Sequence, residues 1–175
     1  MKALNIGVIG LGNIGQKHCD ALRQIRQANV VAVSDINVPV LDKTAASLNA
    51  APYADYKKLL EHPGLEAVIV ALPDQLHRDP VVLAAQAGKH VLVEKPIATT
   101  ETDAKEMMQA AEENGVKLMV GFTLHFIPHY LQARNAVGEN RLAFARQLFL
   151  GVEPVQQIGR IEAPAETAGA AGQHA

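Results

Sequence analysis

The chain has 175 residues, of which 49% are hydrophobic, and its 16 lysine and arginine residues against 18 aspartate and glutamate residues leave a formal net charge of -2. The balanced charge and the absence of a basic run exclude nucleic acid and an anionic membrane surface as expected partners. No apolar stretch approaches the roughly 20 residues that span a bilayer, and a strand predicted close to Met1 leaves no room for a signal peptide. The single cysteine, Cys19, excludes an internal disulfide and a thiolate metal cluster, so we expect a cytoplasmic protein.

Residues 5–35 predict a strand, a glycine-rich turn, a helix, a second strand and an acidic residue, in that order. The segments are the apolar stretch Ile6–Ile9, the turn Gly10-Leu11-Gly12-Asn13-Ile14-Gly15, the helix Gly12–Gln27, the apolar run Val30–Val33 and Asp35. This order is typical of a βαβ unit that binds a dinucleotide. The alternative is a tight βα turn in which Asp35 only caps the next segment.

Each glycine of the turn has a predicted role. Gly10 would allow the tight turn out of the first strand, Gly12 would let a diphosphate approach the backbone, and Gly15 would let the helix sit close to the sheet. The helix N-terminus stabilises an anion by roughly 0.3–2 kcal/mol. Asp35 follows Gly15 at the spacing of about 20 residues from which a carboxylate reaches the hydroxyls of an adenosine ribose.

Beyond Asp35, predicted helices and strands alternate as far as residue 120. Helices are expected over Pro39–Leu48, Pro80–Ala87 and from a cap at Thr99 or Thr100 to Glu113; strands are expected over Glu66–Leu72, His90–Val93 and Val116–Val120; Tyr53–Leu60 is expected to be a short amphipathic turn. Continuous apolar runs are typical of parallel strands buried on both faces. The alternation therefore predicts an α/β fold with a doubly wound, mostly parallel Rossmann sheet. We place His18 at the surface or rim of the first helix and His62 in a turn.

The carboxyl ends of the predicted strands bring the candidate site residues together, because a ligand of a doubly wound sheet binds at that edge. Besides the glycine turn and its acidic partner, the segments Pro73–His77 and Glu94–Pro96 lie there. Pro96 disfavours helical geometry for Lys95, and a lysine beside a nicotinamide could donate a proton to the oxygen of the carbon that receives hydride. Burial would lower the pKa of Lys95, whereas Glu94 would raise it. The alternative is a surface Glu-Lys-Pro turn.

The glycine turn, Asp35, Pro73-x-x-x-His77 and above all Glu94-Lys95-Pro96 together resemble the Gfo/Idh/MocA oxidoreductase family, over about residues 4–138. The stretch Gly121–Pro128 is similar to the family's Gly-aromatic…Arg-Phe-x-Pro segment, with His125 where arginine is usual. The resemblance implies an NAD(P)-dependent oxidoreductase that transfers hydride between a nicotinamide cofactor and a hydroxyl or carbonyl carbon of a sugar, polyol or similar small molecule.

The resemblance also implies roles for individual residues. Gly10, Gly12, Asn13, Ile14 and Gly15 would contact the pyrophosphate, and Asp35 would contact the adenosine ribose. Pro73 and His77 would border the nicotinamide, and Glu94 would orient the ribose or the amide. Lys95 would be catalytic and, with Pro96, would complete the cofactor-binding set. A carboxylate at the ribose repels the extra phosphate of NADP, and no cation follows in Ser34–Asn37. The sequence therefore favours NAD over NADP.

His125 and His129 are four residues apart, which raises the question of a metal site. Because Pro128 is predicted to begin a helix, the pair straddles a helix boundary, and no acidic or cysteine partner stands nearby at ligand spacing. No metal site is predicted, and His125 could instead face the substrate cleft.

Members of the family continue into a second, mostly antiparallel domain. Here we predict a connecting helix over Pro128–Val137, one strand over Leu142–Val152 and a disordered tail from Ala163. The resulting division is a dinucleotide-binding domain over 1–122, a rudimentary second domain over 123–160 and a tail over 161–175, that is, a truncated C-terminal extension. The strand at Leu142–Val152, without sheet partners, would favour a homo-oligomer.

Two other functions fit the glycine turn and the acidic residue. One is a non-catalytic or truncated module that binds a nucleotide without turnover. The other is a methyltransferase, because S-adenosylmethionine also binds to a glycine loop followed by an acid at a strand end. The segments Pro73–His77 and Glu94–Pro96 argue against the methyltransferase.

Overall fold

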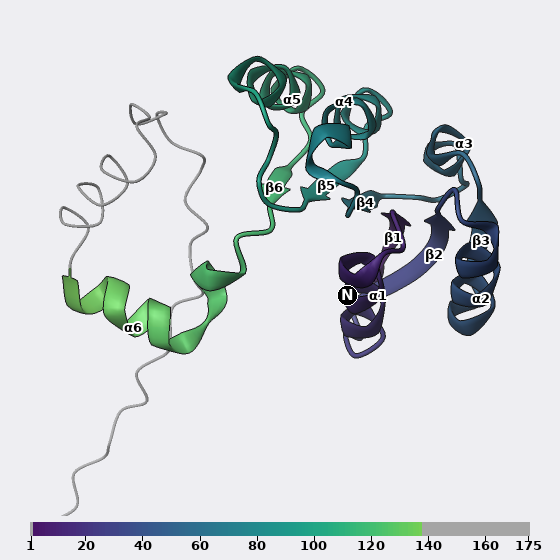
Figure 1. Ribbon diagram of the computed structural model, residues 1–175, viewed down its shortest axis with the longest axis horizontal. Helices are drawn as coiled ribbons and strands as arrows, with labels where there is room; N and C mark the ends of the chain where they lie inside the picture. Colours follow the sequence, from purple (N-terminus) through teal and green to yellow (C-terminus); the bar gives the residue numbers. More distant parts are fainter. Residues whose placement is uncertain (1, 138–175) are drawn as a thin grey trace, which may run out of the picture. The chain divides into compact units, whose positions relative to one another are not determined.

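A computed structural model of the chain describes residues 2–137 (Figure 1). The chain divides into two units, one ending at Thr123 and one beginning at Leu124, and each is described by itself. The first unit contains β1 (Leu4–Ile9), α1 (Asn13–Leu22), β2 (Ala28–Ser34), α2 (Val38–Leu48), β3 (Ala51–Tyr53), α3 (Tyr56–Leu60), β4 (Ala67–Val70), the 3-10 turn η1 (Asp74–Leu76), α4 (Arg78–Gln86), β5 (His90–Val93), α5 (Glu101–Glu113) and β6 (Leu118–Val120).

The six strands form one parallel sheet in the order β3-β2-β1-β4-β5-β6. The chain winds outward from β1 to β3 and then returns to begin again at β4, so the direction of winding reverses between β1 and β4. This reversal defines a doubly wound fold and confirms the predicted Rossmann sheet. At the centre of the sheet, Val8 of β1 lies level with Val33 of β2 and Ile69 of β4.

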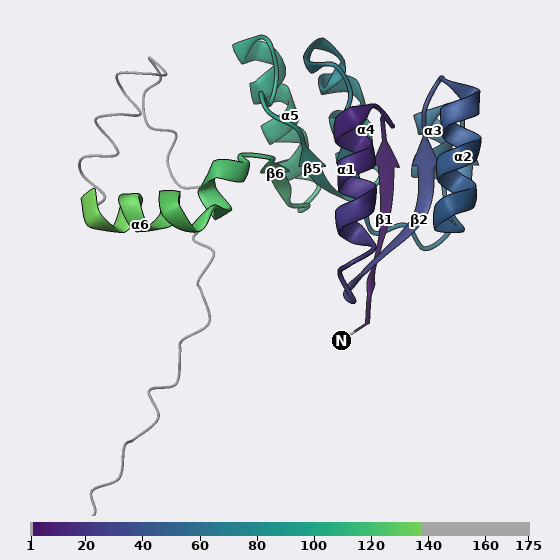
Figure 2. The ribbon, with the colours of Figure 1, turned by 60° about the horizontal axis from the view of Figure 1, so that its bottom comes forward.

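Helices cover both faces of the sheet: α1 and α2 lie on one face, and α3, α4 and α5 lie on the other (Figures 1 and 2). The side chains of β4 alternate between two buried clusters. Ala67 and Ile69 pack in the cluster beneath α1 and α2, whereas Val68 and Val70 pack in the cluster beneath the other three helices. Burial on both faces explains why the strand is apolar throughout, since each buried valine or isoleucine contributes about 1.5–3 kcal/mol.

Local signals place most helix ends. Asp55 caps α3 by accepting a hydrogen bond from the Lys57 N–H at 2.9 Å, and Thr100 caps α5 by accepting one from the Asp103 N–H at 3.1 Å, as one of the two predicted caps. The first helix, by contrast, ends at Leu22 instead of the predicted Gln27. The next residues form tight i to i+3 hydrogen bonds, and Ile25 is 46% exposed, so no apolar face continues the helix.

The predicted turn over Tyr53–Leu60 is wrong in detail, because this stretch holds the end of β3 and the helix α3. The strand β3 escapes sequence reasoning because it has three residues, one of them Pro52, and lies at an edge of the sheet, where proline is tolerated.

The second unit contains the helix α6 (Pro128–Val137). The 3-10 turn η2 (Thr123–Phe126) begins at the last residue of the first unit. The helix α6 has the predicted bounds. The expected strand Leu142–Val152 and the tail from Ala163 lie outside the described residues, and the division at 122/123 and 160/161 stays a prediction. In the part of the chain that the structure describes, no helix is long and apolar enough to cross a membrane.

Candidate functional site

The carboxyl ends of the parallel strands share one edge of the sheet, and the predicted site segments meet there. Gly10 follows β1, Asp35 follows β2, and Glu94 follows β5. The Glu94 N–H donates to the Val70 carbonyl at 3.0 Å, which ties the beginning of the Glu94–Pro96 segment to the end of β4. We call the segment Glu94–Ile97 the lysine loop. The site is therefore formed by the turns that follow neighbouring strands of the sheet.

The glycine turn after β1 needs glycine at two positions. Gly10 has a φ of +91°, and a Cβ atom built on it would lie 2.5 Å from the Ala71 carbonyl oxygen. A Cβ atom on Gly15 would collide with the carbonyl oxygen of Gly10, so α1 starts directly against the turn itself, with the Ala71 side chain next in line. At Gly12, by contrast, a Cβ atom would meet no heavy atom of the described residues within 4 Å. The turn is thus closed beneath Gly10 and Gly15 and open above Gly12.

The N-terminus of α1 lies at this open side of the turn. Gly12 is its N-cap residue, and among the described residues no side chain caps the helix and no acidic residue stands in its first turn. The helices α2, α3 and α5 differ, because Asn37, Asp55 and Thr100 cap them. The first N–H groups of a helix have no partner within it. At α1 they lie beside open space, where the helix dipole favours an anion.

Asp35 contacts the glycine turn. Its Oδ2 accepts a hydrogen bond from the Leu11 N–H at 2.7 Å, and its Oδ1 accepts one from the Asn37 N–H at 2.8 Å. A carboxylate offers about four acceptor positions, so two are left for ligand hydroxyls. The next residue, Ile36, is 91% exposed. The sequence analysis did not name Ile36 as a candidate site residue, although its position directly after a strand-end acid could have indicated one.

The lysine loop places Lys95 in solvent. The Lys95 side chain is exposed, and the Lys95–Pro96 peptide bond is cis. The carboxylate of Glu94 makes two contacts: Oε1 lies 2.8 Å from Nε2 of His18, and Oε2 accepts a hydrogen bond from the Lys95 N–H at 3.2 Å. The burial that the sequence analysis considered for Lys95 is therefore absent in the described part of the chain.

His77 anchors the lysine loop from beneath. Its side chain is fully buried. Nε2 lies 2.9 Å from the Leu72 carbonyl oxygen, and Nδ1 lies 3.0 Å from the Pro96 carbonyl oxygen and 3.3 Å from that of Ile97. Both ring nitrogens face backbone carbonyls, so His77 joins the end of β4 to the lysine loop. Pro73, the first residue of the same motif, is exposed and lies just before η1.

Two other histidines make contacts that the sequence analysis did not predict. His18 was expected at the surface or rim; its side chain is 22% exposed, and its Nε2 lies 2.8 Å from Oε1 of Glu94. His62 is more than a turn residue, because its Nδ1 lies 2.9 Å from the Tyr53 hydroxyl and the two rings meet edge to face. Both contacts join residues far apart along the chain or in different elements, so periodicity could not indicate them. Within residues 2–137, no group of three or more histidine, cysteine or acidic side chains is placed to hold a metal.

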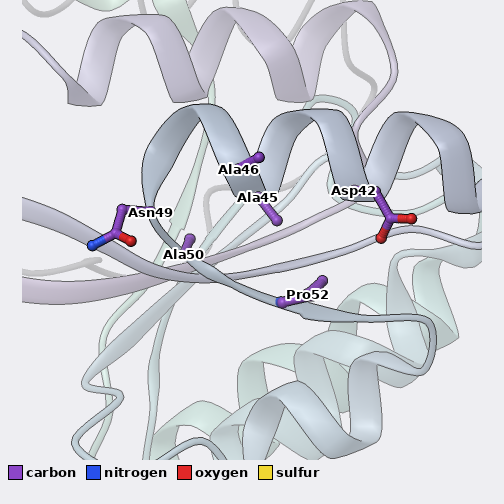
Figure 3. Close-up of a pocket in the computed structure, with 6 residues that line it drawn as sticks. All are labelled: Asp42, Ala45, Ala46, Asn49, Ala50 and Pro52. Atoms are coloured by element: carbon purple, nitrogen blue, oxygen red, sulfur yellow. The ribbon is translucent and has the colours of Figure 1, made fainter.

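A hollow of about 330 Å³ lies elsewhere on the first unit (Figure 3). It lies beside α2 and the edge strand β3, and its lining is Asp42, Ala45, Ala46, Asn49, Ala50 and Pro52. None of the predicted site residues takes part in it. The candidate site is instead the open edge formed by the glycine turn, Asp35 and the lysine loop.

A glycine turn that opens onto a bare helix N-terminus, with an acid of the next strand bonded to the turn, defines a dinucleotide-binding domain of the Rossmann type. Residues 4–122 match the family model GFO_IDH_MocA, described as "Oxidoreductase family, NAD-binding Rossmann fold". The chain belongs to the Gfo/Idh/MocA family of oxidoreductases, and this membership sets the methyltransferase alternative aside.

Named relatives have similar sequences and structures. The chain is 33% identical over 135 residues to myo-inositol 2-dehydrogenase of Thermotoga maritima, a match that covers 77% of this chain and 40% of that protein. It resembles the solved WlbA dehydrogenase of Bordetella pertussis in complex with NADH and UDP-GlcNAcA, with a TM-score of 0.66, 34% identity and coverage of 68% and 35% of the two chains. It also resembles KijD10, a 3-ketoreductase of Actinomadura kijaniata in complex with NADP, with a TM-score of 0.73, 30% identity and coverage of 78% and 44%. The chain spans about two fifths of the length of these relatives.

Proposed function

We propose that this chain is the nicotinamide-dinucleotide-binding part of an oxidoreductase that acts on a sugar, a polyol or a similar small molecule. The observation that carries the proposal is the hydrogen bond of 2.7 Å from the Leu11 N–H to Asp35, which holds the glycine turn beside the strand-end acid. The open side of the turn above Gly12 and the uncapped N-terminus of α1 fit a diphosphate.

Different residues of this edge contact different parts of the proposed cofactor. The diphosphate binds to the N–H groups of Gly12, Asn13, Ile14 and Gly15. Gly10 shapes the turn beneath the diphosphate, because its own N–H donates to the Ser34 carbonyl at 2.8 Å. Asp35 accepts the hydroxyls of the adenosine ribose through its two remaining acceptor positions. The exposed Ile36 offers the adenine base an apolar surface beside that carboxylate. At the nicotinamide end we place Pro73, His77, Glu94, Lys95 and Pro96, with His77 acting through the loop backbone that it holds.

Lys95 is the proposed catalytic residue. The bound nicotinamide would supply or accept the hydride. The exposed Lys95 ammonium carries a proton at Nζ that it can donate to the oxygen of the substrate carbon that receives hydride, and it can take that proton back in the reverse direction. The names of myo-inositol 2-dehydrogenase and the 3-ketoreductase support a polyol or sugar as the substrate class.

We propose NAD as the preferred cofactor. Asp35 places a negative charge beside the ribose, where the extra phosphate of NADP would be repelled. The residues that follow, Ile36 and Asn37, bring no cation to balance that charge. Solved relatives bind NADH in one case and NADP in another, so the preference of this chain rests on its own acid.

The test is a fluorescence titration of NADH and NADPH into the wild-type chain and Asp35→Ala. Loss of the ribose hydrogen bonds should weaken NADH by about 1–3 kcal/mol. Asp42→Ala, which removes a carboxylate of α2 outside the site, is the matched control and should bind NADH as the wild type does. Wild-type chain that binds no NADH, or that binds NADPH more tightly, would contradict the proposal or its cofactor preference respectively.

A second candidate is a module that binds the dinucleotide without turnover. The exposure of Lys95 favours it, because a lysine open to solvent is less well positioned and excludes less water than one in a closed site. NADH binding without oxidation of any polyol would identify this second function.

We also retain self-association as a proposal. The exposed Leu124, Phe126 and Tyr130 of the second unit support it, and sedimentation equilibrium tests it.

A further inference from the structure

His18 and Glu94 form a contact that joins the two ends of the candidate site. His18 lies in the second turn of α1, the helix that starts at the glycine turn, and α1 packs on β1, β2 and β4. Glu94 begins the lysine loop beyond β5, one strand further across the sheet. The distance of 2.8 Å between Nε2 and Oε1 therefore spans from the helix of the glycine turn to the loop of the lysine.

The carboxylate of Glu94 is held on several sides. Its side chain is 14% exposed, and the His18 side chain is 22% exposed. Oε2 accepts the Lys95 N–H at 3.2 Å. A Cβ atom built on Gly121, the residue after β6, would approach Oε1 to 3.3 Å and Oε2 to 3.5 Å, so the carboxylate fits closely beside a residue without a side chain.

An ionised carboxylate only accepts hydrogen bonds, so Nε2 of His18 carries the proton in this contact. The bond fixes one oxygen of Glu94 and thereby directs the other toward the Lys95 N–H. Without His18, the glutamate could swing into solvent and satisfy itself with water, and the Lys95 N–H would lose its acceptor. His18 thus acts on the lysine loop through Glu94.

We infer that His18 is a positioning residue that orients Glu94 and, through it, the backbone at Lys95. This inference rests on the proposed function, in which the diphosphate lies at the start of α1 and the nicotinamide lies at the lysine loop. The His18–Glu94 contact then keeps the two halves of the cofactor site in register. It also explains why a histidine of the first helix is half-buried instead of exposed.

The test compares His18→Ala with His18→Gln, which restores an N–H donor but not the ring. In the ligand-free chain, the ¹H–¹⁵N resonance of Lys95 reports its hydrogen bond to Glu94. We expect that amide proton to move upfield in His18→Ala and to return toward the wild-type position in His18→Gln. In a fluorescence titration, NADH should bind about 3- to 10-fold more weakly to His18→Ala, the loss of one hydrogen bond, and within about twofold of wild type to His18→Gln.

His90→Ala is the matched control, because this histidine lies at the opposite, amino-terminal end of β5, where its Nδ1 accepts the Lys117 N–H at 3.1 Å. It should leave both the Lys95 resonance and the NADH affinity unchanged. If His18→Ala does not fold, His18→Phe replaces it with the same expected result, because phenylalanine has an aromatic ring but no N–H donor.

An unchanged Lys95 resonance in His18→Ala, or a His18→Gln variant as impaired as His18→Ala, overturns the inference. An equal effect of His90→Ala overturns it as well, because the change would then be a general loss of structure. If wild-type chain binds no NADH, the proposed function fails, whereas the Lys95 resonance still decides the role of His18.

Discussion

The glycine turn offers a matched pair of substitutions, Gly12→Ala and Gly15→Ala, that separates cofactor binding from folding. A Cβ atom on Gly12 meets no heavy atom of the described residues within 4 Å, and its backbone φ of -66° suits alanine. A Cβ atom on Gly15 collides with the Gly10 carbonyl oxygen. Because that oxygen belongs to the main chain, it cannot rotate away as the end of a side chain could.

We expect Gly12→Ala to lower the free energy of unfolding by less than about 1 kcal/mol, the cost of a weaker N-cap residue. Its affinity for NADH should nevertheless fall by at least about 10-fold, or about 1.4 kcal/mol, since the added methyl group occupies the space proposed for the diphosphate. Gly15→Ala should lower the free energy of unfolding by roughly 2–3 kcal/mol or more, because the overpacked helix must move away from the turn.

Urea unfolding followed by circular dichroism measures the first quantity, and quenching or enhancement of NADH fluorescence measures the second. A Gly12→Ala chain that binds NADH as the wild type does would show that the diphosphate does not lie at the turn. A Gly12→Ala chain as unstable as Gly15→Ala would show instead that the space above Gly12 is not open, and the geometric basis of the site would be lost.

Three further predictions follow from individual residues. Lys95→Ala should keep the NADH affinity within about twofold and lower kcat roughly 100-fold or more with any polyol that the wild type oxidises; an equal loss of affinity would contradict its role. Burial raises the pKa of the Cys19 thiol to about 11, so a thiol reagent at pH 8 should label Cys19 only after urea unfolding; rapid labelling of folded chain would refute this. The free energy of unfolding should fall as the pH rises from about 9 toward 11, because in this range the unfolded chain releases the thiol proton and the folded chain keeps it. His77→Ala should lower the free energy of unfolding by about 2–4 kcal/mol, since it leaves a cavity and removes the ring whose nitrogens face the carbonyls of Leu72 and Pro96. Urea unfolding measures this change, and a value below about 0.5 kcal/mol would show that His77 does not anchor the loop.

The sequence by itself determined the features that depend on short stretches of chain. The strand β4 is recognisable because burial on both faces requires an unbroken apolar run, and the helix α5 because Thr100 satisfies its first free N–H groups. The glycine turn is recognisable for a similar reason. Gly10 has a positive φ and Gly15 lies in close contact with the backbone. Each position therefore requires glycine, and the two glycines stand at a fixed spacing in the sequence.

Only the tertiary structure decided which side chains of the site meet. His18 and Glu94 are 76 residues apart, and His77 reaches the carbonyl of Pro96 across 19. Hydrogen bonds between distant segments depend on how strands are ordered and how helices lie on the sheet, and neither leaves a periodic pattern in the sequence. The candidate segments were therefore recognisable from the sequence, whereas the burial of His77 and the pairing of His18 became visible only once the sheet had brought their elements together.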